Sequence, residues 1–380
     1  MGALSGVRVI EMAGIGPGPF CGMLLADMGA DVLRIDRSSA PDLGVNFPTK
    51  LDLLNRNKRS AMIDLKSPQG LASLRRLLVK ADVLIEGFRP GVMEKLGLGP
   101  QECLAVNPRL VYGRMTGWGQ EGPLSQAAGH DLNYIALSGV LDAIGPKGQP
   151  PSIPLNVIGD FGGGALYLAM GVLAAVIEAR VSGSGQVVDA AIVDGVSSLL
   201  SMHYAMKQMG AWTNERGSNL LDGGAPFYSV YETKDGRYIS IAAIEGKFYQ
   251  ELLQRLELNA AELPQQHDRR GWDQLRACFA EKFKSRTRAE WCAVLEGTDA
   301  CFAPVLDADE CVTHPHNAAR KVFAQVDGVL HPQPAPRFSR TPSTLRNSPP
   351  APGADTAQAL VDWGFSLEDI AALKEARAIS

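Results

Sequence analysis

Two short segments of the chain offer an imidazole and a carboxylate beside glycine residues. His130 lies within Gly129–Tyr134, and Asp160 lies within Gly159–Gly164. These two side-chain types commonly carry out proton transfer, and glycine lets a ligand approach the backbone closely. A site with both bases can move a proton in either direction, so proton-transfer chemistry is the first hypothesis.

Each of these residues also has a structural interpretation. A single histidine is more often a hydrogen-bonded interior residue, and an aspartate before a glycine run also suits a helix cap. The context of the two segments therefore has to decide. We assign structural roles to the remaining histidines, which are His203, His267, His314, His316 and His331.

The elements that must position these residues follow an α/β pattern. Short β-branched runs alternate with amphipathic stretches, which predicts an α/β domain with an open, Rossmann-like parallel sheet. We expect strands over residues 7–11, 32–36, 61–65, 83–86 and 110–114, and helices over 19–28 and 68–80. In such sheets ligands bind outside the carboxyl ends of the strands.

Basic residues follow several of the predicted strands. A sheet edge with these charges would suit a ligand with several phosphates, such as a coenzyme A nucleotide, and a solvated rim of surface charges is the alternative. The residues expected at this edge are Arg37, Arg59, Lys66, Arg89 and Lys95.

The second half of the chain has a different pattern. Residues 165–212 are expected to be helical, and residues 227–231 and 238–241 to form a hairpin in a smaller α+β domain. A helix is expected over 366–376. The predicted organisation is a large domain over 1–185, a helical linker over 186–222, a small domain over 223–312, and a return segment over 313–380 that completes the large domain.

Composition narrows the function classes. The chain has 380 residues, 46% of them hydrophobic, and a formal net charge of −4, which argues against a nucleic-acid or membrane partner. The apolar stretch 165–177 is about thirteen residues long, so we expect a buried helix rather than a membrane span. No targeting segment is recognisable, and a cytoplasmic location is expected.

The sequence argues against disulfide bonds, a bound metal and a dinucleotide cofactor. The six cysteines contain no C-x-x-C pair, so we expect reduced thiols. His314 and His316 have no acidic or thiol partner at ligand spacing, so we expect no metal. The loop Gly14–Gly18 lacks the third glycine of a dinucleotide fingerprint, because Pro19 and Cys21 stand where it would be needed.

Five motifs, in order along the chain, support a family resemblance that extends from Leu4 to about Pro304. Together they resemble the racemases of the class III CoA-transferase (CaiB/BaiF-type) superfamily. This resemblance implies interconversion of (R)- and (S)-2-methylacyl-CoA thioesters by 1,1-proton transfer through an enolate, in lipid metabolism. Coenzyme A would be part of the substrate, and no separate cofactor is expected. The motifs cover residues 61–66, 81–91, 114–120, 129–134 and 224–228.

The resemblance also implies roles for individual residues. His130 and Asp160 would serve opposite faces of the substrate, and Glu245 would pair with the imidazole and favour its protonated form. Backbone N–H groups of Gly159–Gly164 would donate to the thioester oxygen. Lys95 takes a place where relatives can carry arginine, which makes its phosphate contact less secure. The residues implied to hold the CoA thioester are Arg37, Ile63, Asp64, Leu65, Lys66, Gly87, Phe88, Arg89, Lys95, Gly129, Asp131, Leu132, Asn133 and Tyr134.

Two other functions are open within this resemblance. In a CoA-transferase, Asp160 would attack an acyl-CoA as a covalent nucleophile, but such relatives usually lack equivalents of His130 and Glu245. A CoA-binding protein without catalysis would need the bases replaced. The resemblance further implies an interlocked homodimer, in which Glu245 of one subunit could reach His130 of the other. The sequence does not specify the acyl chain.

Overall fold

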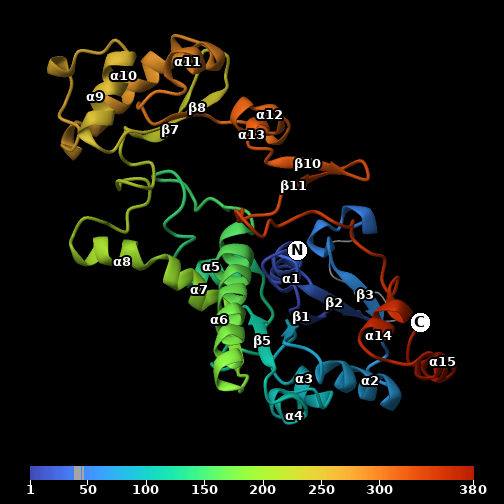
Figure 1. Cartoon of the computed structure of the whole chain (residues 1–380). Coiled ribbons are helices and arrows are strands. Elements are labelled where there is room, and N and C mark those ends of the chain that lie inside the picture. The colour runs from blue at the N-terminus through green and yellow to red at the C-terminus, as the bar shows by residue number, and fades with distance from the viewer. Residues whose placement is uncertain (38–43, 45–46) are drawn as a thin grey trace. The chain divides into compact units, whose positions relative to one another are not determined.

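The computed structural model describes residues 1–37, 44 and 47–380, and it divides into two compact units (Figure 1). The first unit comprises residues 1–138, 155–199 and 318–380, and the second comprises 139–154 and 200–317. This division differs from the predicted boundaries, because residues 139–154 and 200–222 group with the second unit. Arg216 explains the first difference, since its guanidinium donates to the Asp142 carboxylate at 3.0 Å and to the Gln149 carbonyl at 2.7 Å.

The first unit is built on a six-stranded, fully parallel sheet. Its strand order, β3-β2-β1-β4-β5-β6, is that of a doubly wound Rossmann-type fold, so the predicted fold class is confirmed. The strands are β1 (Arg8–Met12), β2 (Asp31–Asp36), β3 (Arg59–Met62), β4 (Val83–Glu86), β5 (Val111–Thr116) and β6 (Val187–Ala191).

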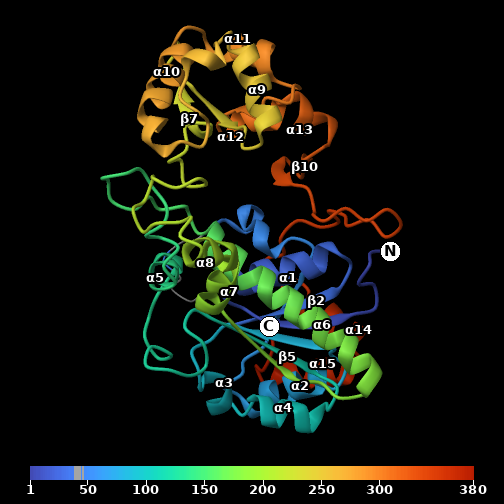
Figure 2. The same ribbon diagram turned by 90° about the vertical axis from the view of Figure 1, so that its left-hand side faces the viewer.

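Helices cover both faces of this sheet (Figure 2). Helices α1 and α6 pack on one face, while α2 and α14 contribute to the main apolar core on the other. The sheet is therefore buried on both sides, as its apolar strands require. The helices of this unit are α1 (Pro17–Asp27), α2 (Pro68–Leu78), α3 (Val92–Lys95), α4 (Pro100–Val106), α5 (Asp131–Leu137), α6 (Leu166–Ser182), α7 (Ile192–Leu199), α14 (Thr356–Asp362) and α15 (Leu367–Glu375).

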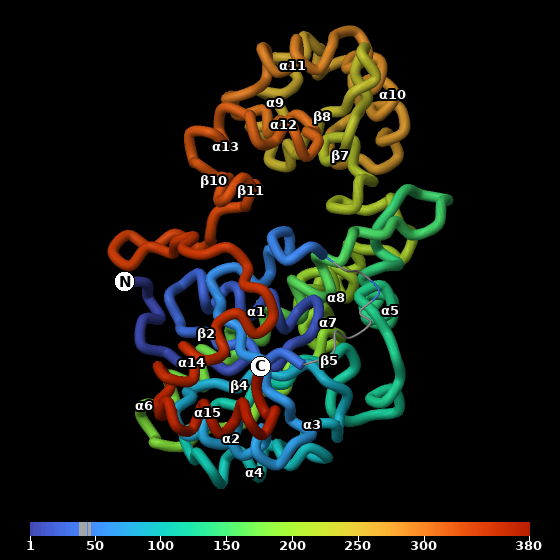
Figure 3. The backbone as a smooth tube through the Cα atoms, turned by 90° about the vertical axis from the view of Figure 1, so that its right-hand side faces the viewer, coloured from blue at the N-terminus to red at the C-terminus, as the bar shows by residue number. Residues whose placement is uncertain are grey.

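The C-terminal segment completes the first unit, beside strands from the beginning of the chain (Figure 3). The Ser60 N–H donates to the Asp355 carboxylate at 2.9 Å, and the Asp64 N–H donates to the Ala378 carbonyl at 2.9 Å. The returning chain thus satisfies backbone groups along β3, the edge strand next to the segment predicted to bind the nucleotide. A short hairpin, β10 (Phe323–Val326) and β11 (Val329–Pro332), belongs to this return.

The prediction of continuous helix over 165–212 is wrong at β6. This strand separates α6 from α7 and pairs in parallel with β5. Gly183, in the left-handed region with φ of 81°, ends α6, and the β-branched pair Val187 and Val188 then enters the sheet.

The apolar helix is longer than the sequence suggested. A π-helical segment, η3 (Val157–Ala165), leads directly into α6, so the helical run Val157–Ser182 is long and apolar enough to cross a membrane by length and composition. The expectation of a short, buried helix is therefore wrong on length and only partly right on burial. One side of α6 packs on the sheet, whereas Met170 and Ile177 are more than half exposed.

The second unit has a three-stranded antiparallel sheet with helices packed around an aromatic core. The predicted hairpin is confirmed as β7 (Tyr228–Glu232) and β8 (Tyr238–Ala242), and a third strand, β9 (Phe302–Pro304), adds to β8. Its helices are α8 (Ser201–Gln208), α9 (Gly246–Arg255), α10 (Trp272–Lys284), α11 (Arg288–Leu295) and α12 (Ala308–Thr313), and α13 (Pro315–Ala319) follows where the chain returns to the first unit.

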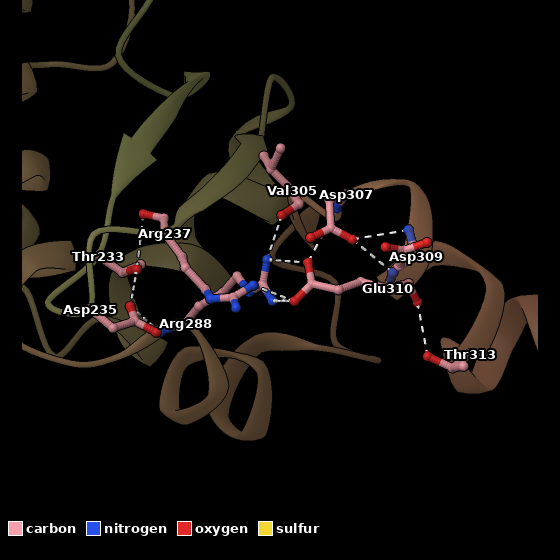
Figure 4. Close-up of polar contacts among 9 residues, drawn as sticks. All are labelled: Thr233, Asp235, Arg237, Arg288, Val305, Asp307, Asp309, Glu310 and Thr313. Atoms are coloured by element: carbon pink, nitrogen blue, oxygen red, sulfur yellow. Dashed lines mark hydrogen bonds and ion pairs between the residues drawn. The ribbon is translucent and has the colours of Figure 1, made fainter.

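An ion-pair cluster lies beside α12 in this second unit (Figure 4). Glu310 pairs with both Arg237 and Arg288, and Arg288 also donates to the Val305 carbonyl at 2.6 Å. The Asp307 carboxylate caps α12 by accepting from the Glu310 N–H at 2.8 Å. The paired guanidinium groups hold the pKa of Glu310 low, at about 2, so this carboxylate stays ionised at neutral pH.

Candidate active site

A cavity of about 500 Å³ opens at the carboxyl ends of β1, β4 and β5 in the first unit. This is the edge of a parallel sheet at which ligands are expected. His130 and Asp160 both line this cavity, although they are far apart in sequence. The other lining segments are Met12–Pro19, Gly87–Pro90, Met115–Trp118 and Ala127–Gly129, with the single residues Arg37, Ile85, Ser125, Tyr134 and Ile192.

The backbone at His130 is fixed by the start of α5. His130 is the residue before the helix, and its N–H donates to Asn133 Oδ1 at 3.0 Å. The Tyr134 hydroxyl donates back to the Gly129 carbonyl, and the Trp118 ring packs edge-on against Tyr134 with ring centroids 4.7 Å apart. These contacts hold the backbone while the imidazole stays exposed to the cavity.

Asp160 lies in the π-helical segment and is partly buried. Its Oδ2 accepts a hydrogen bond from Asn156 Nδ2 at 3.2 Å. Burial raises the pKa of Asp160, and the neighbouring Asp131 charge adds to this, while Asn156 and His130 oppose it. A carboxyl group with a raised pKa is better suited to alternate between acid and base.

Asp131 connects the two segments. Its Oδ1 accepts from the Asp160 N–H at 2.7 Å, and the Gly159 N–H also donates to this carboxylate. A Cβ atom at Gly159 would lie 2.2 Å from Asp131 Oδ1, so only glycine permits this approach. Asp131 is 6% exposed and does not line the cavity, so its carboxylate supports the site from behind.

This arrangement corrects the predicted oxyanion donors at two positions, Gly159 and Asp160. We expected backbone N–H groups of Gly159–Gly164 to meet the thioester oxygen, but those of Gly159 and Asp160 are already bonded to Asp131. The Asp131 carboxylate, which follows His130 in the sequence, accepts from the first free N–H groups of the π-helical turn.

A second cavity, of about 460 Å³, lies at the ends of β2, β3 and β4. Met12, Ala13, Arg37 and Phe88 line both cavities, so the two adjoin. The Arg37 guanidinium lies 5.1 Å from the centre of the Phe88 ring, where the two side chains form part of the shared wall. The other residues of this second cavity are Ile35, Asp36, Ile63, Asp64, Leu65, Lys66, Val92, Lys95 and Leu96.

The predicted binding residues therefore fall into three groups. Arg37, Ile63, Asp64, Leu65, Lys66, Phe88 and Lys95 line the second cavity. Gly87, Arg89, Gly129 and Tyr134 line the first cavity, as Arg37 and Phe88 also do. Asp131, Leu132 and Asn133 line neither, because they form the first turn of α5 behind His130.

One predicted basic residue is misplaced. Arg59 begins β3 and therefore lies at the amino end of the sheet, opposite the ligand edge. It pairs there with Asp31 at 2.7 Å and with Asp362 at 2.6 Å. Arg59 is the first residue of β3 and precedes the predicted strand 61–65, so it lies at the amino end of this strand and not in a connection that follows a carboxyl end.

A buried ion pair shapes the turn that follows β4. The Glu86 carboxylate accepts from Arg114 Nε at 2.8 Å and from the Phe88 N–H at 2.8 Å. Burial raises the pKa of Glu86, and the guanidinium and the Phe88 N–H counter it. This pair fixes Phe88 at the junction of the two cavities.

Glu245 belongs to the second unit. It is exposed and precedes α9, where its carbonyl accepts from the Tyr249 N–H at 2.9 Å. The pairing of Glu245 with His130 stays a prediction.

Sequence reasoning missed several residues of the first cavity. The loop Gly14–Gly18, set aside as a failed nucleotide fingerprint, lines it. Asn156 bonds to Asp160 from four residues earlier, a helical spacing that could have indicated it. Among the described residues, no group of three or more His, Cys, Asp or Glu side chains is placed to hold a metal ion.

Comparison with known proteins places this site in a family. The model of CoA-transferase family III matches residues 4–356, and the chain belongs to that family. The chain is 47% identical over 379 residues to the mouse alpha-methylacyl-CoA racemase, covering 99% of this chain and 97% of that protein, and 44% identical to the human racemase with the same coverage. A CaiB/BaiF family crystal structure from Brucella suis matches with a TM-score of 0.82 and 26% identity, covering 95% of this chain and 99% of that one.

Replacing Asp131 tests its support of Asp160. Asp131→Ala would leave two N–H groups without an acceptor, so we expect the free energy of unfolding to fall by roughly 1–3 kcal/mol. Asp131→Asn keeps an acceptor oxygen and should lose clearly less. Denaturant unfolding of the three proteins measures this difference. Equal losses in the two variants would show that the carboxylate does not hold this backbone.

The raised pKa of Asp160 predicts a pH-dependent stability difference. Because burial disfavours the ionised form, Asp160→Asn should be more stable than the parent protein at neutral pH. The difference should shrink as pH falls through the raised pKa and vanish below the ordinary value of 3.8, where the carboxyl is protonated in both folded and unfolded states. Thermal unfolding from pH 7 to pH 3 measures it. A difference that grows as pH falls would contradict a raised pKa.

Proposed function

We propose that this chain is an α-methylacyl-CoA racemase that interconverts (R)- and (S)-2-methylacyl-CoA thioesters by 1,1-proton transfer. The observation that carries this proposal is the presence of His130 and Asp160 on one cavity that adjoins a second, nucleotide-sized cavity. The mouse and human relatives that bear this activity in their names support it across nearly the whole chain.

The chemistry follows from two bases on one cavity. One base removes the α-proton, the thioester becomes a planar enolate, and the conjugate acid of the other base returns a proton to the opposite face. His130 is exposed to the cavity, and Asp160 is tuned toward its neutral form by burial. Each group can therefore start the reaction as base for one enantiomer and finish it as acid for the other.

The remaining residues place the substrate. The CoA nucleotide occupies the second cavity, where Arg37, Lys66 and Lys95 offer positive charge to its phosphates. The pantetheine arm passes the shared wall at Phe88, and the thioester reaches the first cavity. No separate cofactor takes part, because the thioester itself acidifies the α-proton. Glu245 pairs with His130 and favours its protonated form.

We further propose a cytoplasmic homodimer that works on branched acyl-CoA thioesters. Exposed apolar side chains at Leu166, Met170, Ile177 and Val181 fall along one stripe of α6. Such a stripe on a helix of a soluble protein indicates a surface that another chain covers. In an interlocked dimer the partner subunit would cover it and bring its Glu245 to the active site.

Isotope exchange tests the racemase reaction. In deuterated water, a single enantiomer of a 2-methylacyl-CoA should gain α-deuterium and lose optical purity. His130→Ala should abolish α-proton loss from one enantiomer while the other still exchanges without inversion, and Asp160→Ala should do the reverse. We expect losses of at least about 100-fold at the affected face.

The transferase alternative gives a different result in the same assay. If the chain is a CoA-transferase, no α-deuterium enters, a free acid receives CoA, and Asp160 carries the acyl group as a mixed anhydride that hydroxylamine traps. That outcome would overturn the racemase proposal. Equal losses at both faces in each folded variant would contradict separate bases.

The apolar stripe predicts the oligomeric state. The parent protein should elute and scatter light as a dimer, whereas Ile177→Glu combined with Met170→Glu should produce monomers because it places charges on the covered face. Glu178→Lys, on another side of the same helix, is the matched control and should stay dimeric. An active parent monomer, or one that binds neutral lipid vesicles through this stripe, would contradict the proposal.

A further inference from the structure

A fully buried ion pair lies behind the first turn of α1. Lys58 Nζ is 2.8 Å from the Glu11 carboxylate, and neither side chain is exposed. The same ammonium group donates to the Pro19 carbonyl at 2.9 Å and to Asn55 Oδ1 at 3.0 Å. Its donors are thus divided between β1, the loop before β3 and the beginning of α1.

Stability alone is a weak reason for this pair. Removing two charges from water is costly, and well-packed apolar side chains in such places are often at least as stable. Burial raises the pKa of Glu11 and lowers that of Lys58, so the environment opposes both charges. Gly22 makes room for the pair, because a Cβ atom there would lie 1.7 Å from Glu11 Oε2. The pair is therefore energetically demanding, and stability alone does not account for it.

The turn that Lys58 holds is in contact with the segment of Asp160. A Cβ atom at Gly16 would lie 3.3 Å from Asp160 Oδ2, so the backbone of this turn borders the carboxyl group. One residue after Pro19, the Phe20 ring stacks on the Phe161 ring with centroids 4.5 Å apart. A shift of the first turn of α1 would therefore move the wall against which Asp160 lies.

We propose that Lys58 and Glu11 are a positioning pair for Asp160: by fixing the Pro19 carbonyl, they set the first turn of α1 and hence the place of the Asp160 carboxyl group. This inference rests on the proposed function for its catalytic meaning. Neither residue lines the cavity, so both act through α1 and not on the substrate. His130 is held by the start of α5, and the contacts of the pair reach it only indirectly, through the Asp131 carboxylate that bonds to the Asp160 N–H.

If the Lys58–Glu11 pair positions Asp160, its removal should slow α-proton loss from only one enantiomer of the substrate. Lys58→Met should reduce α-proton loss by about tenfold or more for the enantiomer that Asp160 serves, since small misplacements of a reacting group have large effects on rate. That enantiomer is identified with Asp160→Ala. Exchange of the other enantiomer, and the dissociation constant of CoA, should change less than twofold.

A second variant separates positioning from stability. Lys58→Met leaves Glu11 buried without its partner and lowers the unfolding temperature, whereas Lys58→Met combined with Glu11→Leu removes both charges and should restore much of that temperature. The one-sided loss should persist in the double variant, because Lys58 no longer ties the Pro19 carbonyl to β1 and Asn55. If exchange recovers together with stability, the pair is only structural and the inference is wrong.

The other end of α1 supplies a matched control. Asp27, the last residue of the same helix, forms a buried ion pair with Arg56 at 2.7 Å. Asp27→Asn combined with Arg56→Met should lower stability without a difference between the two enantiomers. A one-sided loss in this control as large as that in Lys58→Met would overturn the inference, since any damage to α1 would then produce it.

The titration of Asp160 can be followed without substrate, so it tests the positioning role independently of the proposed racemase activity. The carboxyl ¹³C signal of Asp160, followed by NMR as a function of pH, should titrate differently in Lys58→Met and unchanged in the control pair. If the parent protein exchanges no α-proton, the racemase proposal fails, and this titration alone decides the positioning role. An unchanged titration in Lys58→Met and in the double variant would overturn that role.

Discussion

The site depends on the Asp131 carboxylate, which accepts hydrogen bonds from the backbone of the segment that carries Asp160. Asp131 follows His130 at the start of α5 and accepts hydrogen bonds from the N–H groups of Gly159 and Asp160. A single buried side chain thereby joins the segment of His130 to the segment of Asp160. Gly159 has to be glycine for this contact to form. The two bases share one cavity because of this link, and the charge of Asp131 also helps to raise the pKa of Asp160.

The parallel sheet sets the second constraint. Its strand order brings the ends of β1 to β5 to one edge, where one cavity holds the proposed bases and the adjoining cavity holds the proposed nucleotide residues. Buried ion pairs stand behind both cavities: Glu86 with Arg114 fixes the turn at Phe88, and Glu11 with Lys58 fixes the first turn of α1. Charged groups in a sheet core oppose stability unless they are fully paired. Both pairs bond to backbone groups of turns that line the cavities, the Phe88 N–H and the Pro19 carbonyl, which is consistent with a role in geometry.

Local patterns in the sequence were enough for the α/β class, for most strands of the sheet and for the hairpin of the second unit. They failed where long-range contacts decide. β6 is short and follows an apolar helix, so its strand character depends on pairing with β5. Arg59 was assigned to the ligand edge although it precedes its strand, and it lies at the opposite end of the sheet.

Motifs in the sequence predicted part of the candidate site. Residues whose roles depend on contacts between distant segments were not predicted. His130 and most nucleotide-side residues lie in ordered motifs, and Asp160 came from its glycine-rich segment and the family resemblance. The roles of Asp131 and Lys58 arise from hydrogen bonds between segments far apart in the chain, which no periodicity signals, whereas Asn156 lies at a helical spacing from Asp160. The loop Gly14–Gly18 was dismissed because it failed a test for a different ligand.

In the proposed reaction His130 and Asp160 face each other across one α-carbon. A crystal structure with a bound, planar enolate-like analogue of a 2-methylacyl-CoA would show this arrangement. We expect the carbon matching the α-position to lie between the two side chains, within about 3–3.5 Å of a ring nitrogen of His130 on one face and of an Asp160 oxygen on the other. An analogue bound with both groups on the same face, or with Asp160 at the thioester carbon and His130 turned away, would contradict it.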